Sequence, residues 1–100
     1  MGMRRKPYWR GLGTPKTLVL FRTPDQWRYA VHFEAPGGFA DGFLDRPAPS
    51  CDAELAQAAL RLKAEEITHR ELEVSWQSTD QPDWWTGIIT KVGPLPAPDH

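Results

Sequence analysis

The chain has 100 residues, of which 40% are hydrophobic and 25% charged, a composition typical of one folded domain and not of a disordered segment. Its net charge of −1 hides an asymmetry: residues 1–50 hold eight Lys and Arg against four Asp and Glu, and residues 51–100 hold four against nine. A single cysteine excludes an internal disulfide framework and a multi-thiolate zinc site, which favours a reducing, cytoplasmic setting. No apolar run approaches the roughly 18 residues that span a bilayer, so we expect a soluble protein without a membrane partner.

An N-terminal arm is predicted over residues 1–16, because prolines and glycines interrupt any regular pattern there. Its cations and aromatic residues are Arg4, Arg5, Lys6, Tyr8, Trp9 and Arg10. Cations neutralise phosphate and aromatic rings stack on unpaired bases, so these residues form the candidate nucleic-acid-binding surface. The acidic second half of the chain would repel a phosphate backbone, and the alternative is that Tyr8 and Trp9 fold back over the core.

The first half of the chain predicts a β-hairpin and a third strand. Residues 26–34 alternate strictly between aromatic or β-branched residues and polar or small ones, the period of a strand with one face on a core. The apolar run at residues 17–22 precedes it, with a turn around Pro24 between the two. After a Pro-Gly-Gly break, residues 39–44 predict a short third strand.

A helix is predicted from about Cys51 to Ile67, with Ser50 as its N-cap. On a helical wheel one apolar side gathers Cys51, Leu55, Ala58, Ala59 and Leu62. A second set extends this arc: Ala56, Leu60, Ala64 and Ile67. The arc is wider than one sheet face requires, so either the arm or the terminal segment covers part of it, or part is left for a partner.

Two further strands are predicted at residues 71–77 and 84–92, followed by a Pro-rich tail at residues 93–100. The order β-β-(β)-α-β-β implies one α+β domain over residues 17–92. Its two layers would be a mostly antiparallel sheet and one helix on one face. The uncovered face of the sheet is predicted to be polar and of mixed charge, with Arg28, His32, Glu34, Glu71, Glu73 and Gln77.

Three tryptophans are the candidate partner-binding residues: Trp76, Trp84 and Trp85. Adjacent residues on a strand point to opposite faces, so Trp84 and Trp85 cannot both enter one core. One of them must cover the far side of the sheet or stand exposed, and exposed tryptophan is a typical interface anchor. We therefore expect a protein partner or a homodimer, with packing under the terminal segments as the alternative.

The sequence predicts no catalytic, metal-binding or cofactor-binding site and no small-molecule substrate. Cys51 lies where a helix N-terminus would activate a thiol, but the wheel turns it toward the core. An enzyme built on Cys51 or His32 would need a second titratable residue beside either side chain, and no spacing provides one. Glu65, Glu66 and His69 lie one helical turn apart, which supplies too few ligands for a metal.

Residues 27–39, followed by Asp41-Gly42 and the Ala-rich segment 53–60, resemble the antitoxin domain of the HicB family. In that family a strand ending in Pro-Gly, a short third strand and an Ala-rich helix form a partial double-stranded-RNA-binding-like fold. The resemblance covers residues 17–67 and implies a protein that neutralises a toxin partner. Here the spacer before the helix is longer, the family's DNA-binding domain is not found in these residues, and residues 84–92 have no place in the pattern.

Taken together, the residues predict a small, non-catalytic binding or regulatory module that binds another protein. The resemblance makes it antitoxin-like or immunity-like. The richness in Arg, Ala, Pro and Trp is typical of GC-rich coding DNA, which favours an accessory protein of bacteria or their mobile elements. The alternative function is nucleic-acid binding through the basic arm, and it would weaken steeply with salt.

Overall fold

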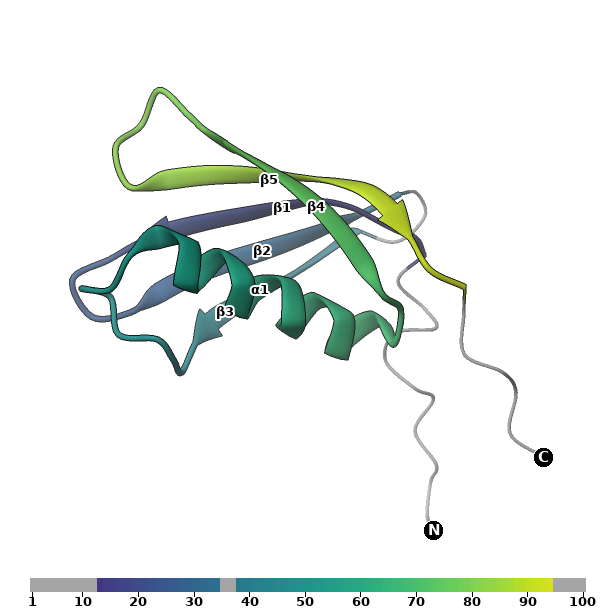
Figure 1. The fold of residues 1–100 in the computed structure, drawn as a ribbon, viewed down its shortest axis with the longest axis horizontal. Helices are drawn as coiled ribbons and strands as arrows, with labels where there is room; N and C mark the ends of the chain where they lie inside the picture. The colour runs from purple at the N-terminus through teal and green to yellow at the C-terminus, as the bar shows by residue number, and fades with distance from the viewer. Residues whose placement is uncertain (1–12, 35–37, 95–100) are drawn as a thin grey trace, which may run out of the picture.

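The computed structural model describes residues 13–34 and 38–94. Within them the predicted order of elements holds, and the short third strand is confirmed. The elements are β1 (Pro15–Arg22), β2 (Trp27–Phe33), β3 (Gly38–Leu44), α1 (Ala53–Thr68), β4 (Leu72–Ser78) and β5 (Trp84–Val92) (Figure 1). β1 begins inside the segment assigned to the arm. The other arm positions, Arg4, Arg5, Lys6, Tyr8, Trp9 and Arg10, and tail residues 95–100 lie outside the described residues.

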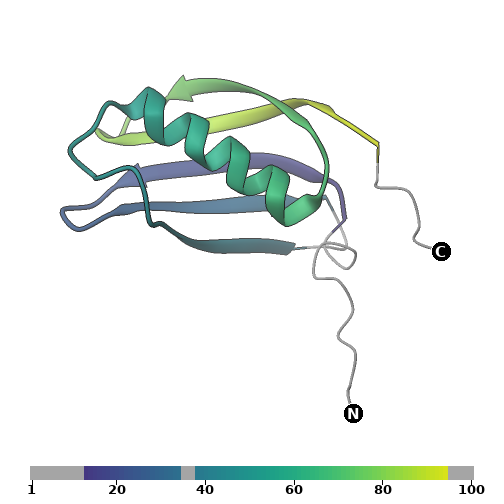
Figure 2. The same ribbon diagram turned by 60° about the horizontal axis from the view of Figure 1, so that its bottom comes forward.

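The described strands form one sheet in the order β3-β2-β1-β5-β4, and each neighbouring pair is antiparallel. α1 joins the edge strand β3 to the opposite edge strand β4, so the chain must cross the sheet at this point. The helix crosses on one face and makes a second layer there (Figure 1, Figure 2). The predicted two-layer α+β architecture, a mostly antiparallel sheet with one helix on one face, is confirmed.

The hydrophobic core lies between α1 and the face of the sheet that it covers. Alternation along β2 places Trp27 and Val31 on this face, and neither side chain is exposed to solvent. Leu18 and Leu20 of β1 lie on the same face, where Leu18 is the register partner of Val31. The remaining buried hydrophobic residues are Tyr29, Phe33, Ala40, Leu44, Ala56, Leu60, Ala64 and Leu72. Burying each large apolar side chain contributes about 1.5–3 kcal/mol, which makes this layer the main source of stability.

Arg22, the last residue of β1, connects the loop before α1 to the sheet through hydrogen bonds. Its guanidinium lies 4.3 Å from the ring centre of Trp27 and donates hydrogen bonds to the carbonyl oxygens of Pro49 and Cys51. Its Nε also pairs with the Asp83 carboxylate at 3.0 Å. The Trp27 indole N–H donates to the Ala48 carbonyl at 3.0 Å, so the same loop is held from two sides.

The predicted start of the helix is wrong by two residues. α1 begins at Ala53 and its N-cap is Asp52, whose side chain makes no capping hydrogen bond; Ser50 does not cap it. Because the Arg22 contacts hold Cys51 in the loop, the first turn forms only after them. At the other end His69 adopts φ 58°, a left-handed conformation that closes the helix, and its N–H donates to the Glu65 carbonyl.

The predicted apolar arc of α1 is confirmed only in part: Ala56, Leu60 and Ala64 are buried and Ala59 and Ile67 pack against the core, but the two leucines placed at its centre do not. Leu55 and Leu62 are 59% and 56% exposed, whereas the buried stripe is Ala56, Leu60, Ala64 and Thr68. Alanines at two of these positions let the helix axis approach the sheet closely, and a stripe of leucines would have held it farther away. The Thr68 hydroxyl is satisfied by the Ala64 carbonyl at 2.8 Å, so burial of this polar residue leaves no unpaired group.

Candidate protein-interaction surface

α1 lies on one face of the sheet (Figure 2), and every other described element is a strand of that sheet, so no described helix or strand covers the opposite face. Strand register arranges its side chains in three rows across the strands. The first row is Phe43, Arg28, Phe21 and Trp84. The second is Asp41, Ala30, Val19, Thr86 and Gln77. The third is Phe39, His32, Thr17, Ile88 and Ser75. We call these residues together the open face.

The open face carries most of the large apolar side chains that the described residues expose. Phe39 is 61% exposed, Phe43 51%, Trp84 38% and Ile88 37%, and the other two such residues, Leu55 and Leu62, lie on α1. Ala30, Val19 and Phe21 lie between these four in the register, so apolar surface continues from β3 to β5. Exposed apolar surface that extends across several strands is typical of an interaction site.

Two ring contacts hold aromatic side chains of the open face in place. Trp84 stacks on Phe21 with ring centres 4.5 Å apart and an interplanar angle of 13°. His32 stacks on Phe39 with ring centres 5.7 Å apart. Side chains ordered before a partner arrives lose less conformational entropy when it binds. The surface is therefore suited to binding as it stands.

The prediction of a polar uncovered face was incomplete. Arg28, His32 and Gln77 do lie on it, because each alternates with residues that face α1, whereas Glu73 helps to line a groove with Arg61 and Leu62 of α1. Glu34 and Glu71 lie just outside the ends of β2 and β4. Sequence reasoning missed Phe21, Phe39, Phe43 and Ile88. The signal that would have found Phe39 and Phe43 is their spacing of four, which puts both on the face opposite the buried Ala40 and Leu44.

The three tryptophans predicted to bind a partner are divided between the two faces. Trp84 lies on the open face, as the alternation argument required of one member of the pair. Trp85 packs against the core, with its ring centre 5.7 Å from that of Trp27. Trp76 is half-buried on the same side as Trp85, and the two line a shallow groove beside Asp52 and Gln57 at the start of α1. Trp84 alone belongs to the open face.

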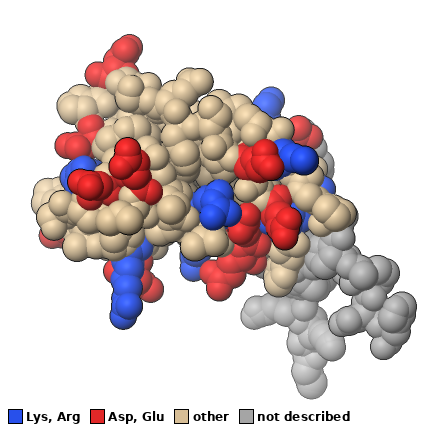
Figure 3. Space-filling model, in the orientation of Figure 1, with Lys and Arg blue, Asp and Glu red and all other residues tan. Residues whose placement is uncertain are grey.

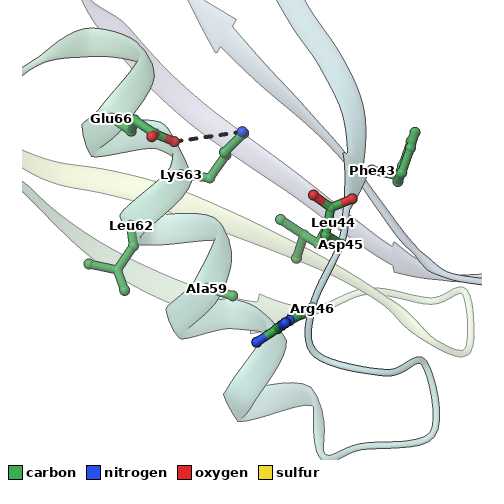
Figure 4. Close-up of a pocket in the computed structure, with 8 residues that line it drawn as sticks. All are labelled: Phe43, Leu44, Asp45, Arg46, Ala59, Leu62, Lys63 and Glu66. Carbon is green, nitrogen blue, oxygen red and sulfur yellow. Dashed lines mark ion pairs between the residues drawn. The ribbon is translucent and has the colours of Figure 1, made fainter.

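A second groove lies between the edge strand β3 and α1 (Figure 4). Leu44 of β3 and Ala59 and Leu62 of α1 supply its apolar lining, and Phe43, whose ring is turned away from α1, borders it at the sheet edge. Its charged lining is Asp45, Arg46, Lys63 and Glu66. Lys63 pairs with Glu66 at 3.6 Å, whereas Arg46 is exposed and has no ion pair with another described residue. The exposed Leu62 is thus part of a groove and not an isolated surface residue.

The described part of the chain carries a net negative charge. Residues 13–34 and 38–94 contain eight Lys and Arg against twelve Asp and Glu. On the side shown in Figure 3 the basic side chains are separated from one another and interspersed with acidic ones. Nucleic acid is bound by basic stripes that follow the phosphates, so this surface does not favour it. The nucleic-acid-binding alternative rests on the arm, outside the described residues.

The structure places the candidate reactive residues apart from one another. Cys51 is half-buried in the loop before α1, packs against the core and donates a weak hydrogen bond to the Asp52 carbonyl at 3.3 Å. His32 lies on the open face. The Glu65 carboxylate accepts hydrogen bonds from Arg61 and from the backbone N–H of Leu72, which joins α1 to β4. No three His, Cys, Asp or Glu side chains of the described residues gather into a possible metal site.

Comparisons with protein-family models, with curated proteins and with solved structures found no match for this chain. Within the described ranges, no helix is both long and apolar enough to cross a membrane. Function is therefore inferred from the surfaces of the fold itself.

Proposed function

We propose that this chain is a small, non-catalytic binding module of the cytoplasm that binds another protein through the open face. The observation that carries the proposal is the position of Phe39, Phe43, Trp84 and Ile88, all large, all exposed and all on the one sheet face that α1 leaves uncovered. Folding alone does not require apolar residues there, since the core of the domain is complete on the other face. Exposed aromatic residues are typical anchors of protein interfaces.

The charges of the open face support a protein partner over a nucleic acid. Arg28 and His32 are its basic side chains, and Asp41 is its carboxylate. A mixed set of this kind suits a polar rim around apolar anchors. The resemblance to HicB antitoxins supports a toxin as the partner, in which case the module would act as an antitoxin or immunity protein of a bacterium or mobile element.

A photo-crosslinking experiment tests this function while the partner is still unidentified. A benzophenone amino acid is placed at Thr86, in the centre of the open face, and as a control at Gln81, in the turn between β4 and β5. The labelled protein is irradiated in extract of the encoding organism, at low and at high salt. We expect a discrete protein adduct from Thr86, absent from Gln81, that persists at high salt.

Two further measurements show which surface and which partner produce an adduct. The variant Trp84→Ala/Ile88→Ala must lose the adduct, because it removes apolar anchors while leaving the core intact. Light scattering behind a sizing column gives the molar mass of the purified chain, so an adduct with a second copy is recognised as a homodimer. An adduct that survives the double substitution, or equal labelling from Gln81, would contradict the proposal. Loss of the adduct at high salt or on nuclease treatment would favour the nucleic-acid alternative.

A further inference from the structure

We propose that the edge strand β3 binds an extended segment of the partner protein as a sixth strand of the sheet. The inference rests on the proposed function, because it takes the partner to be a protein, and it deepens that function by specifying the segment that docks. An edge strand offers a row of backbone N–H and C=O groups, and an extended chain is the partner that satisfies such a row at every second residue.

The two edges of the described sheet differ in how well they can accept a strand. β3 pairs with β2 over seven residues without any break in register, from Gly38 opposite Phe33 to Leu44 opposite Trp27. In the pairing of β4 with β5 the register shifts between Glu73 and Val74, because β5 has one extra residue there, Thr90, and a bulge of this kind increases the local twist of the β4 edge. β3 is therefore the regular edge, and it contains neither proline nor lysine to block an added strand.

Both sides of the β3 edge have apolar surface for the side chains of an added strand. On the open face, Phe39 and Phe43 stand exposed at the two ends of β3. On the other face lies the groove between β3 and α1, with Ala59 turned toward β3 and Leu62 on the outer side of the helix (Figure 4). A strand added about 4.8 Å outside β3 would place alternate side chains over this groove and the others beside the two phenylalanines.

Asp41 identifies the chemistry of the docking segment. It lies on the open face midway between Phe39 and Phe43, its register partner on β2 is Ala30, and it forms no ion pair with another described residue. A strand whose apolar residues face Phe39 and Phe43 therefore has its central residue opposite this carboxylate. Opposite charges in such cross-strand positions stabilise a sheet and like charges destabilise it.

The same geometry disfavours a second copy of this chain as the occupant. Antiparallel pairing of two β3 strands with Phe39 opposite Phe43 would place Asp41 directly opposite its own counterpart. The favoured segment instead has Lys or Arg at its centre, apolar residues two positions to either side, and further apolar residues at the positions that face the groove. If the segment runs antiparallel to β3, an acidic residue at its N-terminal end lies near Arg46, which follows β3.

The test uses a phage-displayed library of short random peptides, selected against the purified full chain. We expect enrichment of peptides with the pattern apolar-x-(Lys/Arg)-x-apolar. Asp41→Lys should lower the affinity of a selected peptide about tenfold, since a cross-strand attraction becomes a repulsion. A peptide with Glu in place of its central cation should reverse this preference and bind Asp41→Lys more tightly than the wild type.

A matched pair of helix variants tests the groove. Leu62→Glu and Leu55→Glu introduce the same charge at two leucines of similar exposure, but only Leu62 lines the groove beside β3. Binding should fall with Leu62→Glu and remain with Leu55→Glu. In amide hydrogen exchange, the peptide should protect alternate residues of β3, those whose N–H groups do not point toward β2.

Failure of this inference is distinguishable from failure of the proposed function. No enriched pattern, or selected peptides that ignore both Asp41→Lys and Leu62→Glu, would overturn strand addition at β3. If the Thr86 adduct persists in that case, the open face still binds a protein and the proposed function stands. If neither the peptides nor the adduct appears, both are rejected.

Discussion

Two chemically identical neighbouring residues are buried to different extents on the two faces of the sheet. Trp84 and Trp85 are adjacent in β5, yet Trp85 packs near Trp27 under α1, and Trp84 remains 38% exposed on the open face. On the covered face, hydrophobic residues of β1 and β2 meet a narrow alanine and leucine stripe and close a core. On the open face, apolar side chains are equally regular but have no covering layer among the described elements.

This difference separates the residues that stabilise the fold from the residues that remain available for binding. One helix can bury only one face of a sheet, so residues on the other face contribute little to the core. An antiparallel sheet with one solvated face usually alternates apolar with polar residues. β5 departs from that rule with Trp84 and Ile88 facing outward, and β3 departs with Phe39 and Phe43. These outward-facing apolar residues support the functional proposal, because the stability of the core does not require them.

The largest loss of stability should come from the covered face, with Trp27→Ala. This substitution removes a fully buried indole, its hydrogen bond to Ala48 and the ring under the Arg22 guanidinium. We expect the free energy of unfolding to fall by about 3–5 kcal/mol, measured by urea denaturation. A loss below about 1 kcal/mol would show that the two faces differ less than their exposure indicates.

Gly87 gives the next largest effect and a direct comparison with its neighbour on the other face. A Cβ at Gly87 would lie 2.7 Å from a methyl carbon of Val74 and 3.0 Å from the Trp76 ring, so Gly87→Ala must displace β4 side chains. We expect it to cost about 1–3 kcal/mol. Thr86→Ala, one residue away on the open face, should change the unfolding free energy by less than about 0.5 kcal/mol. Equal losses from both variants would contradict the assignment of the faces.

Sequence periodicity predicted the strands and the placement of Trp84 and Trp85 on opposite faces, because both depend on local alternation. The period of two along residues 26–34 and 71–77 is enough to place β2 and β4. The same rule required Trp84 and Trp85 to separate, and they do. The domain architecture followed from the order of elements, since β3 and β4 had to be joined by the helix.

The features that sequence reasoning missed depend on long-range packing. The helical wheel centred its apolar arc near Leu55 and Leu62, but packing against the sheet buried the flank of that arc that carries Ala56, Leu60 and Ala64. The start of α1 depends on the contact of Arg22 with Cys51, 29 positions later in the chain, and no local pattern reports that contact. The apolar character of the open face becomes evident only when strand register brings Phe43, Phe21 and Trp84 into one row, with Arg28 between the two phenylalanines.

Trp84→Ala should have a smaller effect on stability than either change to the covered face. It removes one partner of the stack with Phe21, a contact worth about 0.5–1.5 kcal/mol. The same substitution should markedly reduce the yield of the Thr86 adduct, because it removes a large apolar anchor two residues from the crosslinking position. Denaturation and crosslinking of one protein preparation compare the two effects. A large loss of stability with an unchanged adduct would place Trp84 in the fold and not in the interface.

Ile88→Thr tests the contribution of apolar surface to binding, because it changes little else on the open face. Both side chains are β-branched, so the preference of residue 88 for a strand is retained, and its register neighbours are Thr17 and Ser75. Ile88 is 37% exposed, and we expect the unfolding free energy to change by no more than about 0.5 kcal/mol. Affinity for the partner should nevertheless fall, measured as the yield of the Thr86 adduct across a dilution series. Because the fold and the strand are unchanged, a reduced yield can come only from the lost apolar contact, and an unchanged yield would confine the interface to the aromatic residues.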